Sequence, residues 1–550
     1  MGDKALKFNI KPEYIPLIFL IIATIAAINI NKIPLTHPGN IKAADPFYHA
    51  IAVESIKDTE QWNYLPYYIS LGQEKAANLV PPLFYFNAAI LSLFSSLPAW
   101  VTLYLMICIA QGLSIILSYL ITKEVFNEKA AIIASSLSVI PLSASVWLYP
   151  LYIGLWPQLS GYLFIQLFMW LFIRYFKKRE LWSLIFLGIC ISSLLLLHSM
   201  DLGLLLIPCI FIGIDILKRS YVKKKFKLKQ LFKESIAFAG IPAFMLLILL
   251  PRILFVWSSV GGKQYKFGFF GFRELFQRSY LGGLPHPDFF LLPTVLVIIF
   301  TIGVLQQLIN FKKYKLLIFS QIYYFAIIYL LPPFVQDPFY LSGRTRALQY
   351  FMILPTIGYI LYFGLSKLKS KKIENFAILG IFLLAISFAL PSYNNLVDRM
   401  QGEHIPIHEW EAYQWIHANT PKESKVLFFG SVFQTEFIYT KRITAILNMQ
   451  QYQDTINKVA TTNITPTIFE GSWGGNTLRW GNKYEVTPFK YETYEEPNST
   501  IHLTDFDYVV FQDITPQIAQ INRFFIYQFI NNHNFSGAYE KNGYLIIKRN

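Results

Sequence analysis

Charged side chains are scarce in this sequence: Asp, Glu, Lys and Arg make up 15% of its 550 residues, whereas about a quarter is usual for a soluble protein. Hydrophobic residues make up 54%, and the mean hydropathy is +0.40. This composition excludes an ordinary soluble globular protein. The length also exceeds what a single hydrophobic core supports, so we expect a membrane part and one further domain.

Cysteine is scarcer still, with three residues that all lie in apolar runs, Cys108, Cys190 and Cys209. A disulfide framework or a cysteine-based metal site outside these runs is therefore excluded. The sequence also lacks a glycine-rich phosphate loop, a serine nucleophile elbow and a His-Glu-x-x-His pair. It thus carries no motif for soluble nucleotide-sugar or ATP chemistry.

The excess of positive charge is confined to the first part of the chain. The net charge is +15; residues before Pro391 hold 35 Lys and Arg against 17 Asp and Glu, and the remainder holds 13 against 16. Nearly all of the excess lies in short loops between apolar runs, where basic residues set membrane topology and contact anionic headgroups. Because there is no basic soluble domain, we do not expect nucleic acid as a partner.

About eleven apolar segments are long enough to cross the ~30 Å hydrocarbon core of a membrane. If the N-terminus is cytoplasmic, every loop that must then also be cytoplasmic is basic, as the positive-inside rule requires. The predicted spans are residues 14–30, 99–122, 130–147, 157–176, 181–198, 203–217, 234–257, 290–310, 316–332, 347–364 and 374–391. The basic loops are Lys123–Lys129, Arg174–Arg179, Lys218–Lys233, Lys312–Lys315 and Lys367–Lys372.

The predicted fold is a polytopic α-helical membrane domain over residues 1–391, followed by a small extracytoplasmic α/β domain over 392–550. In the second domain, helices are predicted at 408–420 and 514–532, and apolar strands at 425–429, 506–511 and 544–548. The first apolar run is interpreted as an uncleaved span, and the first external loop covers 31–98. In that loop, Pro81–Leu97 is apolar enough to cross the membrane. A crossing there would put two basic loops outside, so we expect a helix that lies in the outer face.

The first external loop contains Asp45, Pro46, His49 and Glu54. Pro46 suits the first turn of a helix and Asp45 its N-cap, which places His49 one turn from Asp45. An acid near the membrane face, followed by histidine at helical spacing, suits a general base or a metal ligand. The alternative is that Asp45 only caps the helix and His49 lies on the surface.

Two further groups lie at outer ends of predicted spans. His198 and Asp201 end the fifth span, where ionisable groups either face a cavity or meet interfacial water. Arg344 and Arg346 precede the tenth span, against the positive-inside trend, and a guanidinium fork there suits a lipid phosphate or pyrophosphate. The alternative is pairing with Asp337 or with ordinary headgroups.

The order of these features resembles the GT-C superfamily of membrane glycosyltransferases, in particular the archaeal and bacterial oligosaccharyltransferase catalytic subunits. The shared features are Asp45 early in the first external loop, a Pro-Pro-Leu helix at Pro81, Arg344 before a late span, and Trp-x4-Trp-x3-Asn-Thr-Pro over residues 410–421. The resemblance implies that Asp45 contacts a metal or acts as base on the acceptor. It also implies that Arg344 binds the phosphate of a polyprenyl-linked donor, with His49 and His198 as helpers.

The remaining candidates are placed by position. Arg346 joins Arg344 at the donor phosphate, and Glu54, Asp201 and Asp337 are auxiliary residues. The chain departs from the oligosaccharyltransferase pattern twice. Residues 428–432 read Phe-Phe-Gly-Ser-Val where Trp-Trp-Asp-Tyr-Gly is expected, and the outer turn 149–156 lacks the second acidic motif. Sequon recognition and a two-carboxylate metal site are therefore not supported.

We predict an integral-membrane enzyme that transfers a sugar or oligosaccharide from a polyprenyl-phosphate-linked donor to an unknown acceptor on the extracytoplasmic face. A divalent metal such as Mg²⁺ or Mn²⁺ is the expected cofactor, and membrane lipid is a partner. One alternative is a transporter or flippase, although no internal repeat is visible and the charged residues cluster at outer span ends. Another is a non-catalytic relative that uses its C-terminal domain as a binding module.

Overall fold

The structure is a computed structural model. Apart from short gaps, it describes residues 44–61, 82–139, 156–259, 291–325, 341–402, 407–429, 439–446 and 505–550, together with residues 18, 66 and 68 and five short strands between 468 and 502. The chain divides into two compact units. The first comprises Met1–Lys32 and Tyr104–Arg399, and the second comprises Ile33–Leu103 and Met400–Asn550. The predicted division at residue 391 was drawn from hydropathy and stays a prediction.

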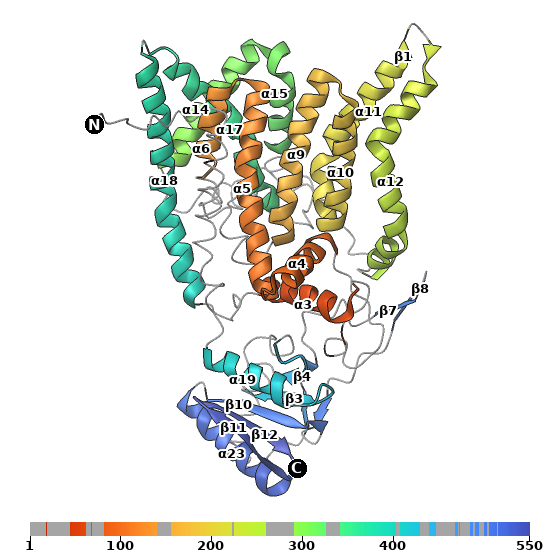
Figure 1. The fold of residues 1–550 in the computed structure, drawn as a ribbon, viewed down its shortest axis with the longest axis vertical. Helices are drawn as coiled ribbons and strands as arrows, with labels where there is room; N and C mark the ends of the chain where they lie inside the picture. The colour runs from red at the N-terminus through yellow and green to blue at the C-terminus, as the bar shows by residue number, and fades with distance from the viewer. Residues whose placement is uncertain are drawn as a thin grey trace, which may run out of the picture. The chain divides into compact units, whose positions relative to one another are not determined.

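Long helices build the first unit, and in Figure 1 many of them run side by side. They are α5 (Ala99–Val125), α6 (Glu128–Leu137), α9 (Trp156–Lys178), α10 (Leu181–Leu197), the 3-10 helix η2 (Ser199–Leu205), α11 (Leu206–Ser220), α12 (Leu228–Ser259), α14 (Leu291–Ile309), α15 (Phe311–Phe325), α17 (Leu341–Leu365) and α18 (Lys371–Gly402). A short hairpin, β1 (Tyr221–Val222) and β2 (Lys225–Phe226), joins α11 to α12. Within the described residues, helices overlie at least part of every predicted span except 14–30, of which only residue 18 is described. The exact number of spans stays a prediction.

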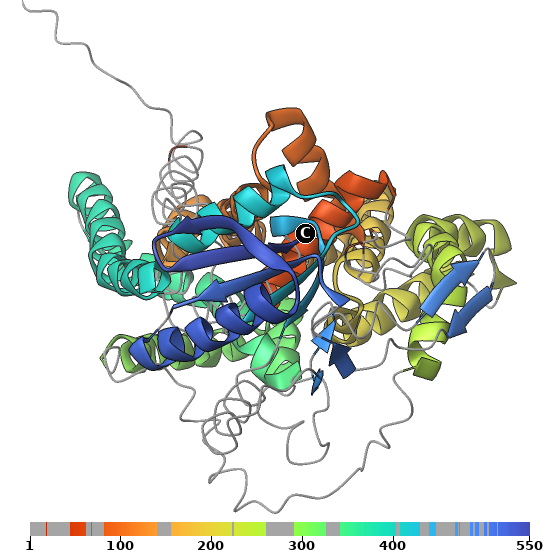
Figure 2. The same ribbon diagram turned by 90° about the horizontal axis from the view of Figure 1, so that it is seen from below.

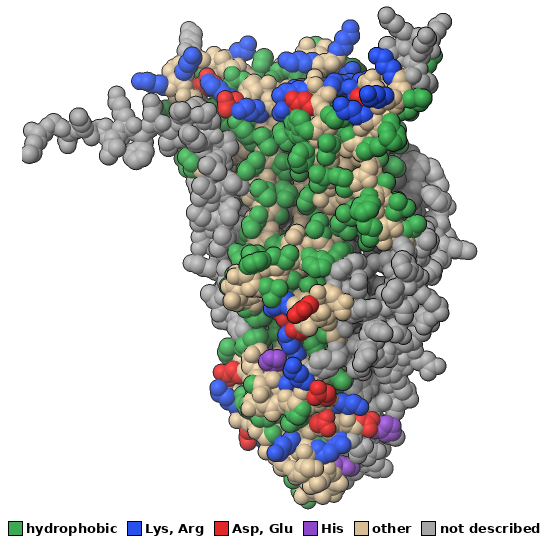
Figure 3. All heavy atoms as spheres, turned by 45° about the vertical axis from the view of Figure 1, so that its right-hand side comes forward, with side chains coloured by type: hydrophobic (Ala, Val, Ile, Leu, Met, Phe, Trp, Pro, Cys, Tyr) green, Lys and Arg blue, Asp and Glu red, His purple; other side chains and the backbone are tan. Residues whose placement is uncertain are grey.

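The helices of the first unit present an apolar surface that suits a membrane. Within the described residues, four helical segments are long and apolar enough to cross one by length and composition: Ala99–Val125, Trp156–Lys178, Leu228–Leu250 and Lys371–Ala389. In an apolar stretch of 18 residues in α12 only 11% of the residues are buried, against 67% in such a stretch of α9. Figure 3 shows the hydrophobic side chains as a band, with Lys and Arg gathered at one end of the helices. An exposed apolar band of this kind is stable against lipid rather than water.

Small residues allow the helices to approach closely. A Cβ atom on Gly358 of α17 would lie 2.6 Å from the carbonyl oxygen of Ala130 and 2.8 Å from the Cβ of Ala134, both on α6. No side chain larger than hydrogen fits there without moving a backbone. Contacts between small residues are a usual way to pack helices in lipid, where apolar burial supplies no driving force.

The second unit contains two helices from the first external loop, α3 (Ala44–Thr59) and α4 (Pro82–Ser95). The helix predicted for Pro81–Leu97 is confirmed. Its 14 residues span about 21 Å at 1.5 Å per residue, which is shorter than the ~30 Å hydrocarbon core. Its position in the outer membrane face stays a prediction.

A six-stranded mixed sheet forms the rest of the second unit, in the order β11-β12-β10-β3-β4-β6. Strands β10, β3 and β4 are parallel, and the other pairs are antiparallel. The strands are β3 (Lys425–Phe429), β4 (Ile443–Ile446), β6 (Ser472–Trp473), β10 (Tyr508–Gln512), β11 (Phe535–Lys541) and β12 (Tyr544–Arg549). The helices are α19 (Ile407–Asn419) and α23 (Pro516–Asn532). Two further strand pairs are β5 (Ile468–Glu470) with β9 (Thr500–His502), and β7 (Tyr484–Thr487) with β8 (Lys490–Thr493).

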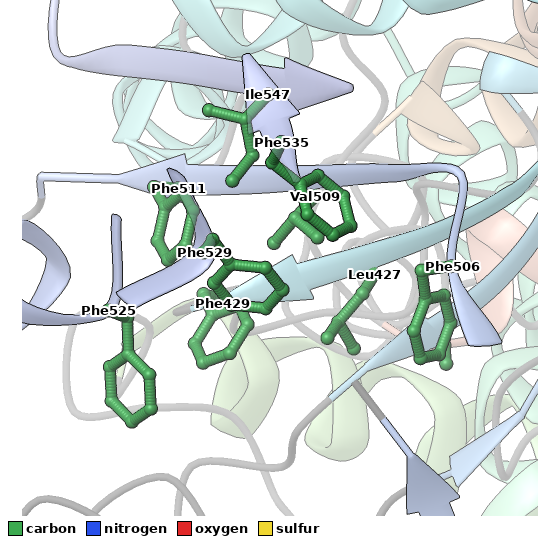
Figure 4. Packing of buried hydrophobic residues seen from close by; sticks show 10 residues of the cluster. Leu427, Phe429, Phe506, Val509, Phe511, Phe525, Phe529, Phe535 and Ile547 are labelled. Atoms are coloured by element: carbon green, nitrogen blue, oxygen red, sulfur yellow. The ribbon is translucent and has the colours of Figure 1, made fainter. Parts of the chain in front are cut away.

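Alternating side chains of the central strands pack into separate cores on the two faces of the sheet, because successive residues of a strand point to opposite sides. On one face, Val426 and Phe428 pack with Tyr413 and Ile416 of α19. On the other, α23 covers a cluster of ten buried residues (Figures 2 and 4): Leu427, Phe429, Ala445, Phe506, Val509, Phe511, Phe525, Phe529, Phe535 and Ile547. The two aromatic residues at the position of the expected Trp-Trp-Asp motif are therefore core residues.

Candidate functional site

Asp45 lies in the first turn of α3, which begins at Ala44. The predicted N-cap at Asp45 is therefore wrong by a small margin, since the helix starts one residue before it. Pro46 is tolerated in the first turn because the amide it lacks has no helical partner there. A carboxylate in the first turn is stabilised by the positive end of the helix dipole. The Asp45 side chain lies outside the described atoms, so its catalytic role stays a prediction.

His49 fastens α3 to α4. Its side chain is buried, and its Nδ1 lies 2.8 Å from the hydroxyl oxygen of Tyr85 on α4. The ring also lies 5.6 Å from the Tyr85 ring and 6.2 Å, edge to face, from the Phe84 ring. The surface location that was the alternative for His49 is wrong, because the ring is part of the packing between these helices. A catalytic function of this histidine stays a prediction.

Glu54 belongs to an ion-pair cluster at the other end of α3. The Lys441 ammonium lies 3.2 Å from Glu54 and 2.8 Å from Asp58, and Lys57 lies 3.0 Å from Glu54. Tyr68 donates a hydrogen bond of 2.7 Å to Asp58. These contacts join α3 to the segment just before β4, far away in the chain.

The charges around Lys441 outweigh the cost of burying its ammonium. Burial lowers the pKa of Lys441, but the charges of Glu54 and Asp58 and the hydrogen bonds to both raise it further, so the pKa lies above its usual value. Lys441 is therefore cationic throughout the physiological range. The arrangement gives Glu54 a structural partner, while its auxiliary role in catalysis stays a prediction.

His198 and Asp201 lie together at the junction of α10 and η2. The Nδ1 atom of His198 is 3.1 Å from the Oδ1 atom of Asp201, whose side chain has no exposed surface. Directly beside it lies Gly161 of α9, where a Cβ atom would be 2.8 Å from the Oδ2 atom of Asp201. Asp201 is thus enclosed within the first unit rather than open to interfacial water. A buried acid next to a histidine is an arrangement that can hold or move a proton.

Arg344 and Arg346 lie in the first two turns of α17, which begins at Leu341. The free amides at a helix N-terminus favour an anion. Their side chains lie outside the described atoms, as does the whole of Asp337. Asp45 and Arg344 belong to different compact units, and their convergence on one cavity stays a prediction.

The Trp-x4-Trp-x3-Asn-Thr-Pro motif forms structural contacts. Trp410 packs edge to face on Trp100 with ring centres 5.5 Å apart, and Trp415 packs on Tyr539 at 5.4 Å. Arg442, which the sequence analysis did not single out, is buried beside the end of α19. Its guanidinium donates to the carbonyl oxygens of His417 and Thr420 at 2.8 and 2.6 Å and to the Thr420 hydroxyl at 2.8 Å. No local sequence signal marks this role, because its partners lie on another element.

Among the residues that the structure describes, no three or more His, Cys, Asp or Glu side chains lie together as a metal site. The described pair His198 and Asp201 offers two such groups. The metal expected at Asp45 stays a prediction.

The fold is similar to that of solved membrane transferases. ArnT from Cupriavidus metallidurans bound to undecaprenyl phosphate matches with a TM-score of 0.52 at 11% identity, over 97% of this chain and 97% of that protein. Its apo state matches with a TM-score of 0.50 at 10% identity. The apo oligosaccharyltransferase of Archaeoglobus fulgidus matches with a TM-score of 0.50 at 14% identity, over 81% of this chain and 65% of that enzyme. The chain thus spans about two thirds of the oligosaccharyltransferase and nearly all of ArnT, and at these identities the similarity shows a shared fold.

Sequence comparison gives a family match. The model of a family of unknown function (DUF6541) matches residues 6–339, which is more than half of the chain. No curated protein matches the sequence.

Proposed function

The chain belongs to the family of unknown function DUF6541, and from its fold and its acidic and basic residues we propose that it is an integral-membrane glycosyltransferase. Its donor is a sugar or oligosaccharide linked to a polyprenyl phosphate, and transfer takes place on the extracytoplasmic face. The observation that carries the proposal is the fold similarity over 97% of both chains to ArnT, a protein solved with bound undecaprenyl phosphate.

The positions of Asp45 and Arg344 support this function. Asp45 lies in the first turn of α3, and a carboxylate is one of the side chains that serve as a general base. Arg344 lies in the first turn of α17, where the free amides add to the attraction for a phosphate. A lipid-linked donor also explains why the chain has no motif for a soluble nucleotide sugar.

In the proposed reaction, an acceptor hydroxyl or amide attacks the anomeric carbon of the donor. A new bond forms between the acceptor atom and the sugar, the bond from the sugar to the lipid phosphate oxygen breaks, and the phosphate keeps that electron pair. Asp45 takes the proton from the acceptor. Arg344, with Arg346, stabilises the negative charge that grows on the departing phosphate. A divalent metal, when bound at Asp45, would supply further stabilisation of that charge.

The test replaces Asp45 by Asn in the full-length protein. The purified protein is reconstituted in proteoliposomes with a radiolabelled sugar linked to undecaprenyl phosphate as the donor. An extract of the extracytoplasmic side of the membrane supplies the acceptor, and the radiolabel that leaves the lipid is counted. We expect Asp45→Asn to lower the rate at least about a hundredfold, as for loss of a general base. Glu60→Gln, which removes an exposed acid just beyond the end of α3, is the matched control and should keep full activity.

A second variant tests the phosphate contact. Arg344→Lys keeps the charge but loses the bidentate fork, which acts on charge that grows in the transition state, so we expect kcat to fall about tenfold, equivalent to about 1.4 kcal/mol, with a smaller change in the KM for the donor. Full transfer by Asp45→Asn would refute the assigned base. Movement of the lipid-linked sugar across the membrane without transfer would favour a flippase, and donor binding without turnover a non-catalytic relative.

A further inference from the structure

Three helices of the first unit enclose a groove that the proposed transfer reaction does not use. It has a volume of about 280 Å³ and lies between α9, α11 and α15. Aromatic and aliphatic side chains form most of its wall: Phe172, Phe176, Phe211, Ile214, Phe319 and Tyr323. The rings of Phe211 and Phe319 approach to 6.2 Å and join α11 to α15. The volume is small for a ligand pocket and suits one narrow chain.

One end of the groove is basic. Arg179, Lys218 and Lys315 line it there, with Asp215 as its acidic residue. Asp215 is occupied by an ion pair with Arg179 and lies 3.4 Å from the Nε atom of Arg219. Within the described part of the chain, no ion pair involves Lys218 or Lys315. The mouth therefore has an excess of positive charge and two ammonium groups available to an anion.

The whole groove, its basic end included, has about the length of one membrane leaflet. On α11 the lining runs along one helix face from Ile207 to Lys218, a rise of about 16 Å at 1.5 Å per residue. This is about half of the ~30 Å hydrocarbon core. Ile207, Phe211 and Phe319 are 38%, 42% and 45% exposed, so the groove opens sideways from the helices, where lipid rather than water surrounds them.

We infer that this groove binds one anionic phospholipid, with a hydrocarbon chain along the apolar wall and the phosphate between Lys218 and Lys315. A soluble phosphate could use only the basic mouth and would leave the apolar wall uncovered. A neutral lipid could use only the wall. An anionic lipid satisfies both, and the basic loops gathered at this end of the helices (Figure 3) concentrate such lipids nearby.

The test measures lipid retention by the full-length protein. The protein is placed in nanodiscs of phosphatidylcholine mixed with phosphatidylglycerol that carries the same acyl chains. The protein is then released from the nanodiscs, and the lipids that remain bound to it are counted by native mass spectrometry. We expect the wild type to retain one phosphatidylglycerol. In Lys218→Gln/Lys315→Gln, its affinity should fall about 25-fold, since each basic group near an anionic surface contributes about fivefold. Lys178→Gln/Lys312→Gln removes two exposed lysines from α9 and α15 outside the groove and should change affinity less than about twofold.

A second pair of variants tests the apolar wall. Ile214→Trp fills the groove, while Leu217→Trp adds the same bulk on another face of α11, where Leu217 is 51% exposed. We expect only the first to lower retention. The inference is overturned if both lysine pairs weaken binding equally, if phosphatidylcholine is retained as well as phosphatidylglycerol, or if 10 mM inorganic phosphate displaces the lipid. If the Lys218→Gln/Lys315→Gln variant does not fold, the retention of phosphatidylglycerol by Ile214→Trp is measured in its place, and normal retention by that variant overturns the inference.

Discussion

Asp201 is fully buried and touches a position where only glycine fits. A Cβ atom on Gly161 would lie 2.8 Å from the Oδ2 atom of Asp201 and 3.4 Å from a methyl group of Leu194. The aspartate cannot swing into water, because its side chain has no exposed surface and its Oδ1 atom faces His198. We therefore predict that Gly161→Ala lowers the free energy of unfolding by about 1–3 kcal/mol, the usual cost of overpacking. Thermal unfolding in detergent measures the change in Tm.

The control for this variant is Gly213→Ala on α11, where a Cβ atom would meet nothing within 4 Å. It should leave the Tm unchanged or raise it slightly, because alanine favours helix. In an Asp201→Ser background the crowding is relieved, so the cost of Gly161→Ala should shrink. Equal losses of Tm in Gly161→Ala and Gly213→Ala would show that the contact with Asp201 is not the cause.

At the residue scale, the sequence indicated which side chains are unusual but not what they contact. The place of Asp201 near a span end could be predicted, but the sequence left open whether it faces a cavity or interfacial water, and its neighbour Gly161 lies on another helix and carries no pattern of its own. His49 was correctly placed on a helix, but its burial against Tyr85 depends on α4, where Tyr85 lies 36 residues further along the chain. Lys441 and Arg442 were missed because their partners are distant in the chain.

The C-terminal end of α19 is held by a side chain from outside the helix. The last carbonyls of a helix lack helical partners, and Arg442 donates to those of His417 and Thr420. Arg442 is 3% exposed, so no water can replace it freely. We predict that Arg442→Met lowers the free energy of unfolding by about 2–4 kcal/mol, because the carbonyl oxygens stay buried without donors. Hydrogen exchange at the amides of residues 416–420 should quicken in the variant.

Arg523→Met is the matched control, since Arg523 is an exposed arginine on α23. It removes the same charge from the same part of the chain without touching α19. Exchange that quickens equally in both variants, or only in regions away from α19, would contradict the capping role of Arg442.

At the element scale, strands that are short apolar runs could be predicted and an edge strand with one buried side chain could not. The predicted strand at 425–429 coincides with β3, and those at 506–511 and 544–548 overlap β10 and β12. The helices predicted at 408–420 and 514–532 are α19 and α23 within two residues. β11 was missed because Phe535 is its one fully buried side chain. Its stability comes from hydrogen bonds to β12, which a burial pattern does not reveal.

At the scale of the whole molecule, apolar length and loop charge are one-dimensional signals, and they predicted helices where the structure has them from α5 to α18. The proposed meeting of Asp45 and Arg344 would be a three-dimensional property. It depends on how segments far apart in the chain are brought together, and periodicity does not encode that. For this reason the membrane helices could be predicted from composition, whereas the proposed site rests on resemblance and fold similarity.

The sidedness of the whole chain can be tested with single cysteines. The native cysteines give a low background, because Cys108 and Cys190 are buried and Cys209 lies in the apolar helix α11. We predict that Tyr527→Cys on α23, where Tyr527 is 65% exposed, reacts with a membrane-impermeant maleimide in right-side-out vesicles. Lys312→Cys, in one of the basic loops, should react only after permeabilisation, because the positive-inside rule places that loop in the cytoplasm.

Both variants must label fully in detergent, which shows that each thiol is accessible to the reagent in the folded protein. Because both positions are exposed, a difference in labelling by the same reagent reports only the side of the membrane on which each position lies. Labelling of Lys312→Cys in sealed vesicles, with Tyr527→Cys protected, would reverse the orientation. Arg344 and Arg346 of α17 and Asp45 of α3 would then face the cytoplasm, where soluble nucleotide sugars are present. A lipid-linked donor would then no longer be favoured over a nucleotide sugar.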